Sequence, residues 1–423
     1  MFLTGHPRPF ERQLTSAKGF YVNECKLVHA MHEISSPRRD FLRKSLLLAL
    51  PAVGAVLPVS AFAYMAQPAL ENVYVPPTRT RGSAVLSVRD FGAHGDGIHD
   101  DTTAFQNAVD ALPSAGGTVN VPAGNYVIDP TRNVRLRSKM HLKLATGAVL
   151  RAKRNSAERA YVLMVYKVSD VEISGGQIIG DREVHTGTSG EWGHGIMVRG
   201  SSRVTVRDIH LSKCWGDGMS IGGAMVTNQP SIPCNDVVVA NIVSTANRRQ
   251  AISIGRSSQV LVYDSEFSYT SGITPGCGVD IEPDDDEMGA THVHLENCLI
   301  RRNAGNGIQV YKRVEGVTIK KCVIEYNGGY GVLTIGAKGG YIAQNQFRHN
   351  YLQGTMLRSA CNDYQVSGNI YRNNHTRLHG VNTNYGPLIY MTGLIGGNHG
   401  NGAHIQATTD TFNIRVTSNG YST

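Results

Sequence analysis

The chain has 423 residues, of which 17% are charged and 7% aromatic, and it contains 47 glycines. Its formal net charge is +8, but residues 64–423 carry 33 basic and 29 acidic side chains, an excess of only +4. An excess this small argues against a nucleic-acid-binding protein and mildly favours an anionic partner over a cationic one.

The N-terminal 63 residues are typical of an export signal. Arg38 and Arg39 precede a short, Pro-interrupted apolar stretch at 46–57, and a small-x-small cleavage site follows at 61–63. The stretch is too short for a comfortable membrane span. The paired arginines predict a twin-arginine signal, with an ordinary secretory signal as the alternative. We therefore expect an exported protein, periplasmic or extracellular, with no membrane span after signal removal.

Met31 is a plausible start, which would make residues 1–30 an upstream extension. Residues 64–84 are expected to form a linker. One predicted helix follows, Thr103–Ala111, which Asp101 or Thr102 can cap. We expect this helix to close the open end of the domain, as terminal caps of repeat folds must.

Residues 88–128 read VRDFGAHGDGIHDDTTAFQNAVDALPSAGGTVNVPAGNYVI. This segment resembles the opening of the pectate-lyase-like β-helix superfamily, in its rhamnogalacturonase, epimerase and phage-tailspike branch. The resemblance implies a right-handed parallel β-helix. It leaves the chemistry open, because the superfamily contains lyases, epimerases, hydrolases and non-catalytic tail proteins.

Glycine-led strands recur from about residue 194 to 364. Each has a turn residue, a small residue and then an apolar–any–apolar pattern, as in HGIMVRG, DGMSIGG, QAISIG, CGVDIEP, NGIQVYK and YGVLTIG. The small residues are 23, 33, 27, 29 and 24 positions apart. A period of 20–50 residues indicates a solenoid, and the two-residue alternation indicates strands with one buried face.

A second strand recurs in each unit, for example VTVRDIHL at 204–211. A polar residue interrupts it at a position that suits a left-handed bend. These positions are Asp208, Asn241, Asp264, Asn297 and Lys321. The sequence therefore predicts an all-β chain, with a single parallel β-helix over 85–381 and a looser C-terminal tail over 382–423.

The segment CGVDIE at 277–282, followed by a strand and RRNAGNGIQV, is similar to the catalytic coil of alginate C5-epimerases. Asp280 matches that family's aspartate. Glu282 stands where the family has histidine, and Ile281 where it has proline. The similarity covers about forty residues and implies proton chemistry on a uronate.

The repeat register places certain side chains in three outward columns. The first is His194, Asp217, Gln250, Cys277, Asn306 and Tyr330. The second is Met197, Ser220, Ser253, Asp280, Gln309 and Leu333. The third is Arg199, Gly222, Gly255, Glu282, Tyr311 and Ile335. Because outward neighbours along a strand are ~6.7 Å apart, Asp280 and Glu282 should share one face.

Two chemistries fit this face. In β-elimination or C5-epimerisation of a uronate, Arg249, Lys312 or Arg313 would neutralise the substrate carboxylate, and Tyr311, Lys312 or His194 would act as base or acid. In glycoside hydrolysis, Asp280 and Glu282 would form the acid/base pair. Asp217 would join the catalytic group, one coil from His194 and within hydrogen-bond reach of it. The expected substrate-binding residues are Arg248, Arg249, Arg313, Gln250, Asn306, Gln309 and Trp215.

Calcium is the expected ion, held by the acidic run Asp284, Asp285 and Asp286, which equally fits a solvated loop; no organic cofactor is expected. A third possible function is that of a non-catalytic glycan-binding β-helix such as an adhesin, which the clustering of acids disfavours.

Six cysteines remain after signal removal. Cys298 and Cys322 share one register, so buried free cysteines are favoured over a disulfide. The chain contains no CxxC pair and thus no sign of a zinc site.

Overall fold

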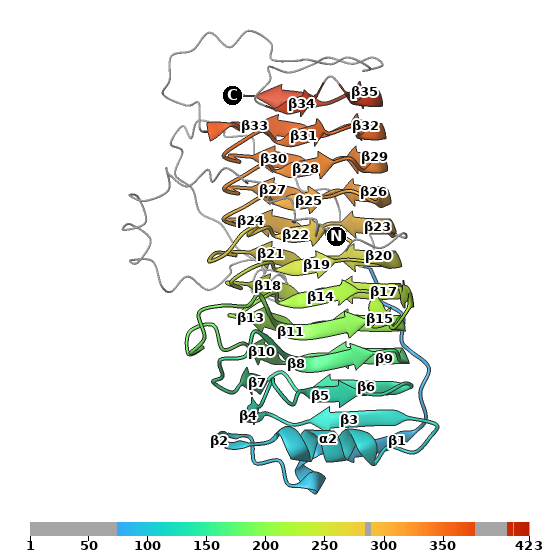
Figure 1. Cartoon of the computed structure of the whole chain (residues 1–423), viewed down its shortest axis with the longest axis vertical. Coiled ribbons are helices and arrows are strands. Elements are labelled where there is room, and N and C mark those ends of the chain that lie inside the picture. Colours follow the sequence, from blue (N-terminus) through green and yellow to red (C-terminus); the bar gives the residue numbers. More distant parts are fainter. Residues whose placement is uncertain (1–73, 284–288, 377–403, 409, 423) are drawn as a thin grey trace, which may run out of the picture. The chain divides into compact units, whose positions relative to one another are not determined.

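The computed structural model describes residues 74–283, 289–376, 404–408 and 410–422. Over these residues the chain is a stack of parallel coils (Figure 1). Each complete coil contributes one strand to each of three long sheets, here called A, B and C. The predicted right-handed parallel β-helix is confirmed. Within the described ranges, no helix combines the length and the apolar character that crossing a membrane requires.

Sheet A has twelve strands. They are β1 (Ala84–Ser87), β3 (Gly117–Val121), β6 (Met140–Leu144), β9 (Ser169–Ser174), β12 (Ser202–Arg207), β17 (Cys234–Ala240), β20 (Ser257–Tyr263), β23 (Ala290–Glu296), β26 (Val314–Lys320), β29 (Lys338–Ala343), β32 (Asn362–Ser367) and β35 (Phe412–Thr417).

Sheet B also has twelve strands. They are β2 (Asp96–Asp100), β4 (Gly124–Ile128), β7 (Ala148–Ala152), β10 (Gln177–Ile179), β13 (His210–Ser212), β18 (Val243–Thr245), β21 (Glu266–Ser268), β24 (Leu299–Arg301), β27 (Val323–Glu325), β30 (Gln346–Arg348), β33 (Ile370–Arg372) and β36 (Gly420–Ser422).

Sheet C has ten strands and carries the glycine-led repeats. They are β5 (Val134–Leu136), β8 (Arg159–Tyr166), β11 (Trp192–Arg199), β14 (Met219–Gly222), β19 (Ile252–Ile254), β22 (Val279–Ile281), β25 (Ile308–Val310), β28 (Val332–Ile335), β31 (Thr355–Arg358) and β34 (Ile405–Ala407). An antiparallel hairpin of β15 (Ala224–Val226) and β16 (Gln229–Ile232) projects from one coil.

The expected second strand of each repeat is in fact two strands, one in sheet A and one in sheet B. The residue between them has positive φ, as at Asp208 (55°), Asn241 (51°) and Asp264 (50°). Asn297 and Lys321 take the same conformation, at 55° and 52°. A left-handed residue turns the chain sharply, so each polar bend ends one strand and starts the next.

The interior is filled by inward Val, Ile and Leu side chains and by buried asparagines at the turns. Asn303, Asn327, Asn350 and Asn374 form one amide ladder, with Nδ2–Oδ1 distances of 2.8–2.9 Å. Each amide also donates to the carbonyl of a sheet B strand, as Asn327 Nδ2 does to Ile300 O in the middle of β24. These ladders satisfy buried polar groups inside the coils and leave the outer faces free for other roles.

The cap helix α2 (Thr102–Asp110) matches the predicted one within a residue. It follows a short 3-10 helix, η1 (Val88–Phe91). Asp101 stands at the N-cap position but makes no side-chain cap. Its carboxylate accepts from the backbone N–H groups of His94 and Gly95 at 2.6 and 3.0 Å. Thr102 bonds Asp100 instead, so the expectation that Asp101 or Thr102 caps the helix is wrong in detail.

Two segments that were predicted to lie outside the solenoid are in fact part of it. Residues 74–83 lie along the outer face of sheet A, where Tyr74 stacks on Tyr263 with ring centroids 3.8 Å apart. The strands within Ile405–Ser422 pair in parallel with β31, β32 and β33. The looser tail expected from 382 is therefore wrong for Ile405–Ser422. The predicted signal peptide, with Arg38 and Arg39, lies outside the described residues.

Candidate functional site

The strand register confirms the second of the three predicted columns on sheet C. Ser253 of β19 pairs with Asp280 of β22, and Asp280 pairs with Gln309 of β25. Met197 and Ser220 continue the same column in β11 and β14. A stack of polar side chains therefore crosses four neighbouring strands.

Asp280 lies at the centre of this stack, but it is almost fully buried. Its exposed fraction is 1%. The outward position predicted for Asp280 is correct, but it does not expose the side chain to solvent. Gln250 Nε2 donates to one carboxylate oxygen at 2.6 Å, and Gln309 Nε2 donates to the other at 3.1 Å. Both glutamines were expected to bind substrate; here they hold Asp280.

Backbone groups fix the orientation of these two amides. The N–H of Cys277 donates to Gln250 Oε1 at 2.8 Å, which leaves Gln250 Nε2 for Asp280. The N–H of Tyr330 donates to Asn306 Oδ1, and Asn306 Nδ2 donates to Gln309 Oε1 at 3.0 Å. Because a backbone N–H can only donate, the side-chain amides of Gln250, Asn306 and Gln309 each have one possible orientation. Asp280 therefore meets two fixed donors.

Burial raises the pKa of Asp280 to about 8, and the nearby Glu282 carboxylate adds to the rise. Arg249 and the hydrogen bond from Gln309 act in the opposite direction on this pKa. A carboxyl that titrates close to neutral pH can exchange a proton in either direction during turnover. Such a group, placed between a carboxylate and a cation, is typical of functional sites.

Asp217 forms a second buried carboxylate, one strand beyond Ser253. Ser253 Oγ lies 2.7 Å from its Oδ2, and the Gln250 N–H donates to its Oδ1 at 3.1 Å. Arg249 Nη1 lies 3.4 Å from both oxygens, and Arg249 Nε donates to Glu191 at 3.0 Å. Burial raises the pKa of Asp217, while Arg249 and Ser253 lower it.

His194 hydrogen-bonds Asp217 as expected, and the Asp217 carboxylate lies 3.6 Å from His194 Nδ1. The backbone N–H of Asp217, not its carboxylate, donates to His194 Nδ1 at 3.0 Å. Burial, reinforced by Arg199 and Arg249, holds the pKa of His194 well below its ordinary value. The imidazole is therefore neutral, and its Nδ1 lone pair is occupied. The Nδ1 of His194 is thus held by the backbone of Asp217, and its role as catalytic acid or base stays a prediction.

The remaining predicted residues lie on the next coils. Glu282 is exposed, Tyr311 is half-buried, and Lys312 is exposed with its ammonium 5.7 Å from the Tyr311 ring centre. Arg313 donates to the carbonyl of Pro283 at 2.9 Å. Tyr311 N–H donates to Ile281 O, so this basic segment lies beside the strand of Asp280. Exposed cations and a carboxylate thus border the buried acid.

Trp215 and Arg248 form a platform at the edge of the site. The Arg248 guanidinium lies 3.6 Å from the Trp215 ring centre and donates to the carbonyls of Gly190 and Trp215. His185 stacks on the same tryptophan at 3.9 Å. The other tryptophan of the chain, Trp192, is stacked by Arg159 at 3.7 Å.

Several members of the site were missed by the sequence analysis. Glu191 binds Arg249, while Arg199 donates to Ser220 Oγ at 2.8 Å and thereby extends the network that reaches Asp217. The predicted columns already contained Ser220, Ser253 and Arg199. Their role could have been predicted, because each lies one coil from a charged or hydroxyl side chain that it can bond. Glu191, Trp192 and His185 lie in or beside a loop whose path the repeat pattern does not predict.

Asp284, Asp285 and Asp286 lie outside the described residues, so the calcium expectation stays a prediction. Within the part of the chain that the structure describes, no three His, Cys, Asp or Glu side chains converge as metal ligands would. The six cysteines from Cys214 to Cys361 are free and buried, as expected.

The opening of the domain and the coils match two protein families. Residues 85–164 match "Rhamnogalacturonase A/epimerase, pectate lyase-like". Residues 153–287 and 273–420 match "Right handed beta helix region". The second match spans more than half of the chain.

Similar proteins include an uncharacterized protein and an epimerase. The chain is 29% identical over 300 residues to YclG of Bacillus subtilis, covering 64% of this chain and 49% of that protein. It is 27% identical over 286 residues to the mannuronan C5-epimerase AlgE2 of Azotobacter vinelandii, covering 67% and 21%. The chain thus spans about half or less of these relatives' lengths.

A similar solved structure is the surface adhesin PfbA of Streptococcus pneumoniae. Its TM-score is 0.61 at 17% identity, over 80% of this chain and 90% of that one. At this identity the likeness concerns the fold alone. The strand register, the buried asparagine ladders and the family match over 153–420 together identify the chain as a member of the right-handed β-helix family.

Proposed function

We propose that the protein is a carbohydrate-active enzyme that acts on an acidic polysaccharide by β-elimination or C5-epimerisation of uronate residues. The observation that carries this proposal is Asp280, a buried carboxyl held by two fixed amides, with a pKa raised to about 8 by burial. The similarity to a mannuronan C5-epimerase over 286 residues supports the substrate class.

Both reactions begin with loss of the proton on C5, next to the uronate carboxylate. Glu282, exposed on the strand of Asp280, accepts this proton, and Lys312 and Arg313 neutralise the substrate carboxylate. Asp280 then donates a proton. In elimination the proton goes to the C4 oxygen as the C4–O bond breaks; in epimerisation it goes to the opposite face of C5. Arg249 offsets the negative charge that remains on Asp280.

Glycoside hydrolysis is the second candidate. Two carboxyls on one face of a strand are ~6.7 Å apart, within the lower part of the ~6.5–9.5 Å that inverting glycosidases use. The environments of the two groups differ, with Asp280 buried and Glu282 exposed, which is the usual way to separate an acid from a base. In this reaction no cation opposite a substrate carboxylate is needed.

Two further parts of the proposal concern export and calcium. We propose that Arg38 and Arg39 direct the folded protein through the twin-arginine route, which replacement of both by Lys would block. Calcium, bound through Asp284, Asp285 and Asp286, would neutralise the substrate carboxylate beside Lys312 and Arg313. Chelation by EDTA would then abolish turnover on uronate polymers and leave the folded protein's melting temperature nearly unchanged.

The deciding experiment is turnover of a glycan panel. Polymannuronate, polygalacturonate and neutral glycans are followed by absorbance of unsaturated products, by the epimer ratio and by reducing ends. Asp280→Asn should lower turnover by about 100-fold or more, since acid/base groups typically contribute 10²–10⁴-fold. Asp264→Asn, at a turn between sheets A and B, is the matched control and should change nothing.

Full activity of Asp280→Asn would refute the proposed site. Lys312→Ala with Arg313→Ala separates the chemistries. A lyase or epimerase should lose activity on uronate polymers. A hydrolase should keep most of its turnover and lose only binding.

A further inference from the structure

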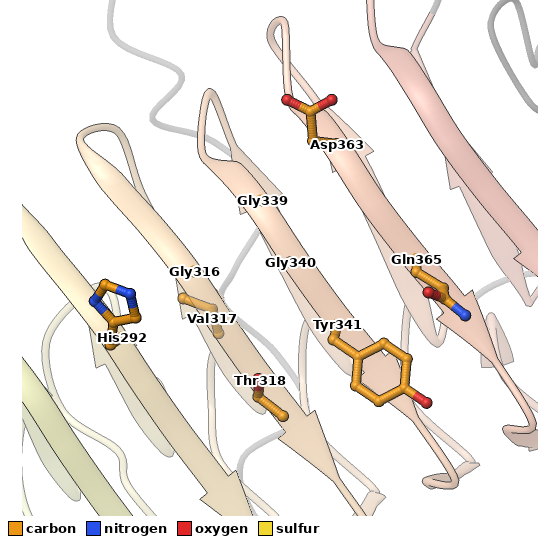
Figure 2. Close-up of a pocket in the computed structure, with 9 residues that line it drawn as sticks. All are labelled: His292, Gly316, Val317, Thr318, Gly339, Gly340, Tyr341, Asp363 and Gln365. Atoms are coloured by element: carbon orange, nitrogen blue, oxygen red, sulfur yellow. The ribbon is translucent and has the colours of Figure 1, made fainter.

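A groove of about 420 Å³ lies on the outer face of sheet A, on a different sheet from Asp280. It crosses the neighbouring strands β23, β26, β29 and β32 (Figure 2). Its lining residues are His292, Gly316, Val317, Thr318, Gly339, Gly340, Tyr341, Asp363 and Gln365. Its volume is in the range of small-ligand sites.

Two glycines create this groove. Near the start of each sheet A strand from β9 to β35, one residue has positive φ and stands outside the strand pairing. Seven of these nine positions carry side chains: Asp170, Arg203, Asp236, Gln259, His292, Asp363 and Asn413. Only Gly316 and Gly339 interrupt the column, at φ 75° and 63°. In Figure 2 they are bare ribbon between His292 and Asp363.

The positive φ of these two residues favours glycine, but it does not demand it, and the packing leaves room for a side chain. Seven other residues adopt the same conformation with a side chain. A Cβ at Gly316 or Gly339 would meet its nearest neighbour at 3.6 or 3.7 Å, an ordinary contact. At Gly340, in contrast, a Cβ would lie 2.0 Å from the Tyr364 ring. Gly340 is therefore explained by packing, whereas Gly316 and Gly339 suit their left-handed backbone and also keep the floor of the groove open.

The side chains along the groove combine an aromatic ring with hydrogen-bonding groups. Tyr341 is 36% exposed, with Thr318 and Gln365 on the strands to either side (Figure 2). Within the described residues, these three side chains have no hydrogen-bond partner in the protein. A ring beside free hydroxyl and amide groups suits a ligand with apolar C–H faces and hydroxyl edges, which is the chemistry of a sugar.

The outer face of sheet A already contacts one extended segment, residues 74–83 of this same chain. Over the preceding coils, the ring of Tyr74 stacks on Tyr263 at 3.8 Å. Arg79 binds Asp236, a member of the positive-φ column, at 2.7 Å. This extended segment thus crosses the strands of sheet A and is held there by ring stacking and by polar contacts to the positive-φ column. The groove offers the same two kinds of contact, beginning at the strand after Tyr263.

We propose that this groove is a second saccharide-binding site, which holds a strand of the polysaccharide away from the catalytic face. The inference rests on the proposed function for its substrate class. The groove spans three coil steps, about 14 Å, and each ~4.8 Å step is close to one pyranose unit. A polymer bound here stays tethered while Asp280 acts on another stretch of it.

The test fills the groove. Gly316→Asn with Gly339→Asn uses the residue found at position 413 of the same column, and Tyr341→Ala removes the ring. Gly368→Asn is the matched control, since Gly368 has φ 64° in a turn between sheets A and B and a Cβ there would meet nothing closer than 3.7 Å. Affinity for polymannuronate and polygalacturonate is measured by calorimetry in the Asp280→Asn background, where turnover should be slowed about 100-fold.

The filled groove and Tyr341→Ala should each raise the polymer Kd about five- to tenfold, and the control should leave it unchanged. With Asp280 intact, the KM for polymer should rise while turnover of short oligosaccharides stays the same. An unchanged Kd in folded Tyr341→Ala would overturn the proposal. So would polymer binding that appears only when residues 64–73 are removed, because the groove would then belong to the chain itself.

Failure here and failure of the proposed function are distinct. Loss of binding in the groove variants without any turnover by the parent would sustain the second site and refute the enzyme. If turnover depends on Asp280 while the groove variants bind and turn over polymer like the parent, the enzyme is supported and the second site is refuted.

Discussion

The outer faces of sheets A and C use one solenoid for two different kinds of surface. On sheet C, acidic side chains are buried and saturated with hydrogen bonds, as Asp280 and Asp217 show. On sheet A, the glycines at 316 and 339 keep a shallow groove open. Strand register alone therefore does not decide which side chains are accessible to solvent. A preorganised, dry site suits chemistry, and an open one suits recognition.

The largest expected effect on stability comes from uncoupling the buried charges of sheet C. Arg249→Met leaves the fully buried Asp217 carboxylate without its cation, which should cost about 3–5 kcal/mol in urea unfolding at neutral pH. Arg248→Met is the control, because it removes a ring contact and two bonds to carbonyls and leaves no buried carboxylate unpaired. It should cost about 1 kcal/mol. Equal losses would contradict the role given to Arg249.

The loss in Arg249→Met should depend on pH. Burial raises the pKa of Asp217, and Arg249 opposes that rise. Without Arg249 the pKa of Asp217 rises further, so folding favours the protonated form more strongly. The stability deficit is therefore largest at high pH and shrinks as the pH falls and Asp217 is protonated. A deficit that grows toward acid pH would contradict this assignment.

The next effect concerns Asp280 and its influence on folding. Its pKa is about 8 in the folded state against 3.8 ordinarily, so the folded protein binds the extra proton between these values. The stabilisation is complete at low pH and disappears as the pH rises. Relative to Asp280→Asn, the parent should therefore become steadily less stable as the pH rises from about 4 to 8. Parallel stability curves for the two proteins would contradict it.

A smaller pair of effects separates the neighbouring glycines of sheet A. Gly340→Ala should cost about 1–3 kcal/mol, since its Cβ would overlap the Tyr364 ring. Gly339→Asn should cost no more than about 1 kcal/mol, because Asn tolerates the left-handed backbone and its side chain enters the groove. Thermal unfolding compares the two variants. A large loss in Gly339→Asn would mean that the glycine serves the fold and not the groove.

The periodic part of the structure could be predicted from the sequence. The stacking of Ser253, Asp280 and Gln309 followed from a two-residue alternation within strands and one glycine per coil. The polar bends, with positive φ at residues such as Asn241, were predicted from side chains that tolerate this conformation. Local patterns determine such features, and the pattern repeats enough times to be recognised.

The parts that escaped prediction depend on distant contacts. The alternation shows that Asp280 points outward, but only the relay through Gln250 and Gln309 shows that it is buried. Likewise, Glu191 reaches Arg249 from a loop 58 positions away. The last coil, Ile405–Ser422, was missed because the segment before it breaks the repeat. Long-range packing of this kind leaves no periodic trace in a single sequence.

The most direct test of the proposed proton transfer is the titration of Asp280 itself. Carbon-13 NMR of the aspartate side-chain carboxyls, assigned by comparison with Asp280→Asn, reports each protonation separately. We expect one carboxyl whose pKa lies near 8 and whose resonance is missing in Asp280→Asn. If the missing resonance instead titrates in the ordinary aspartate range near 3.8, Asp280 is a fixed structural anion and the proposed proton transfer is contradicted.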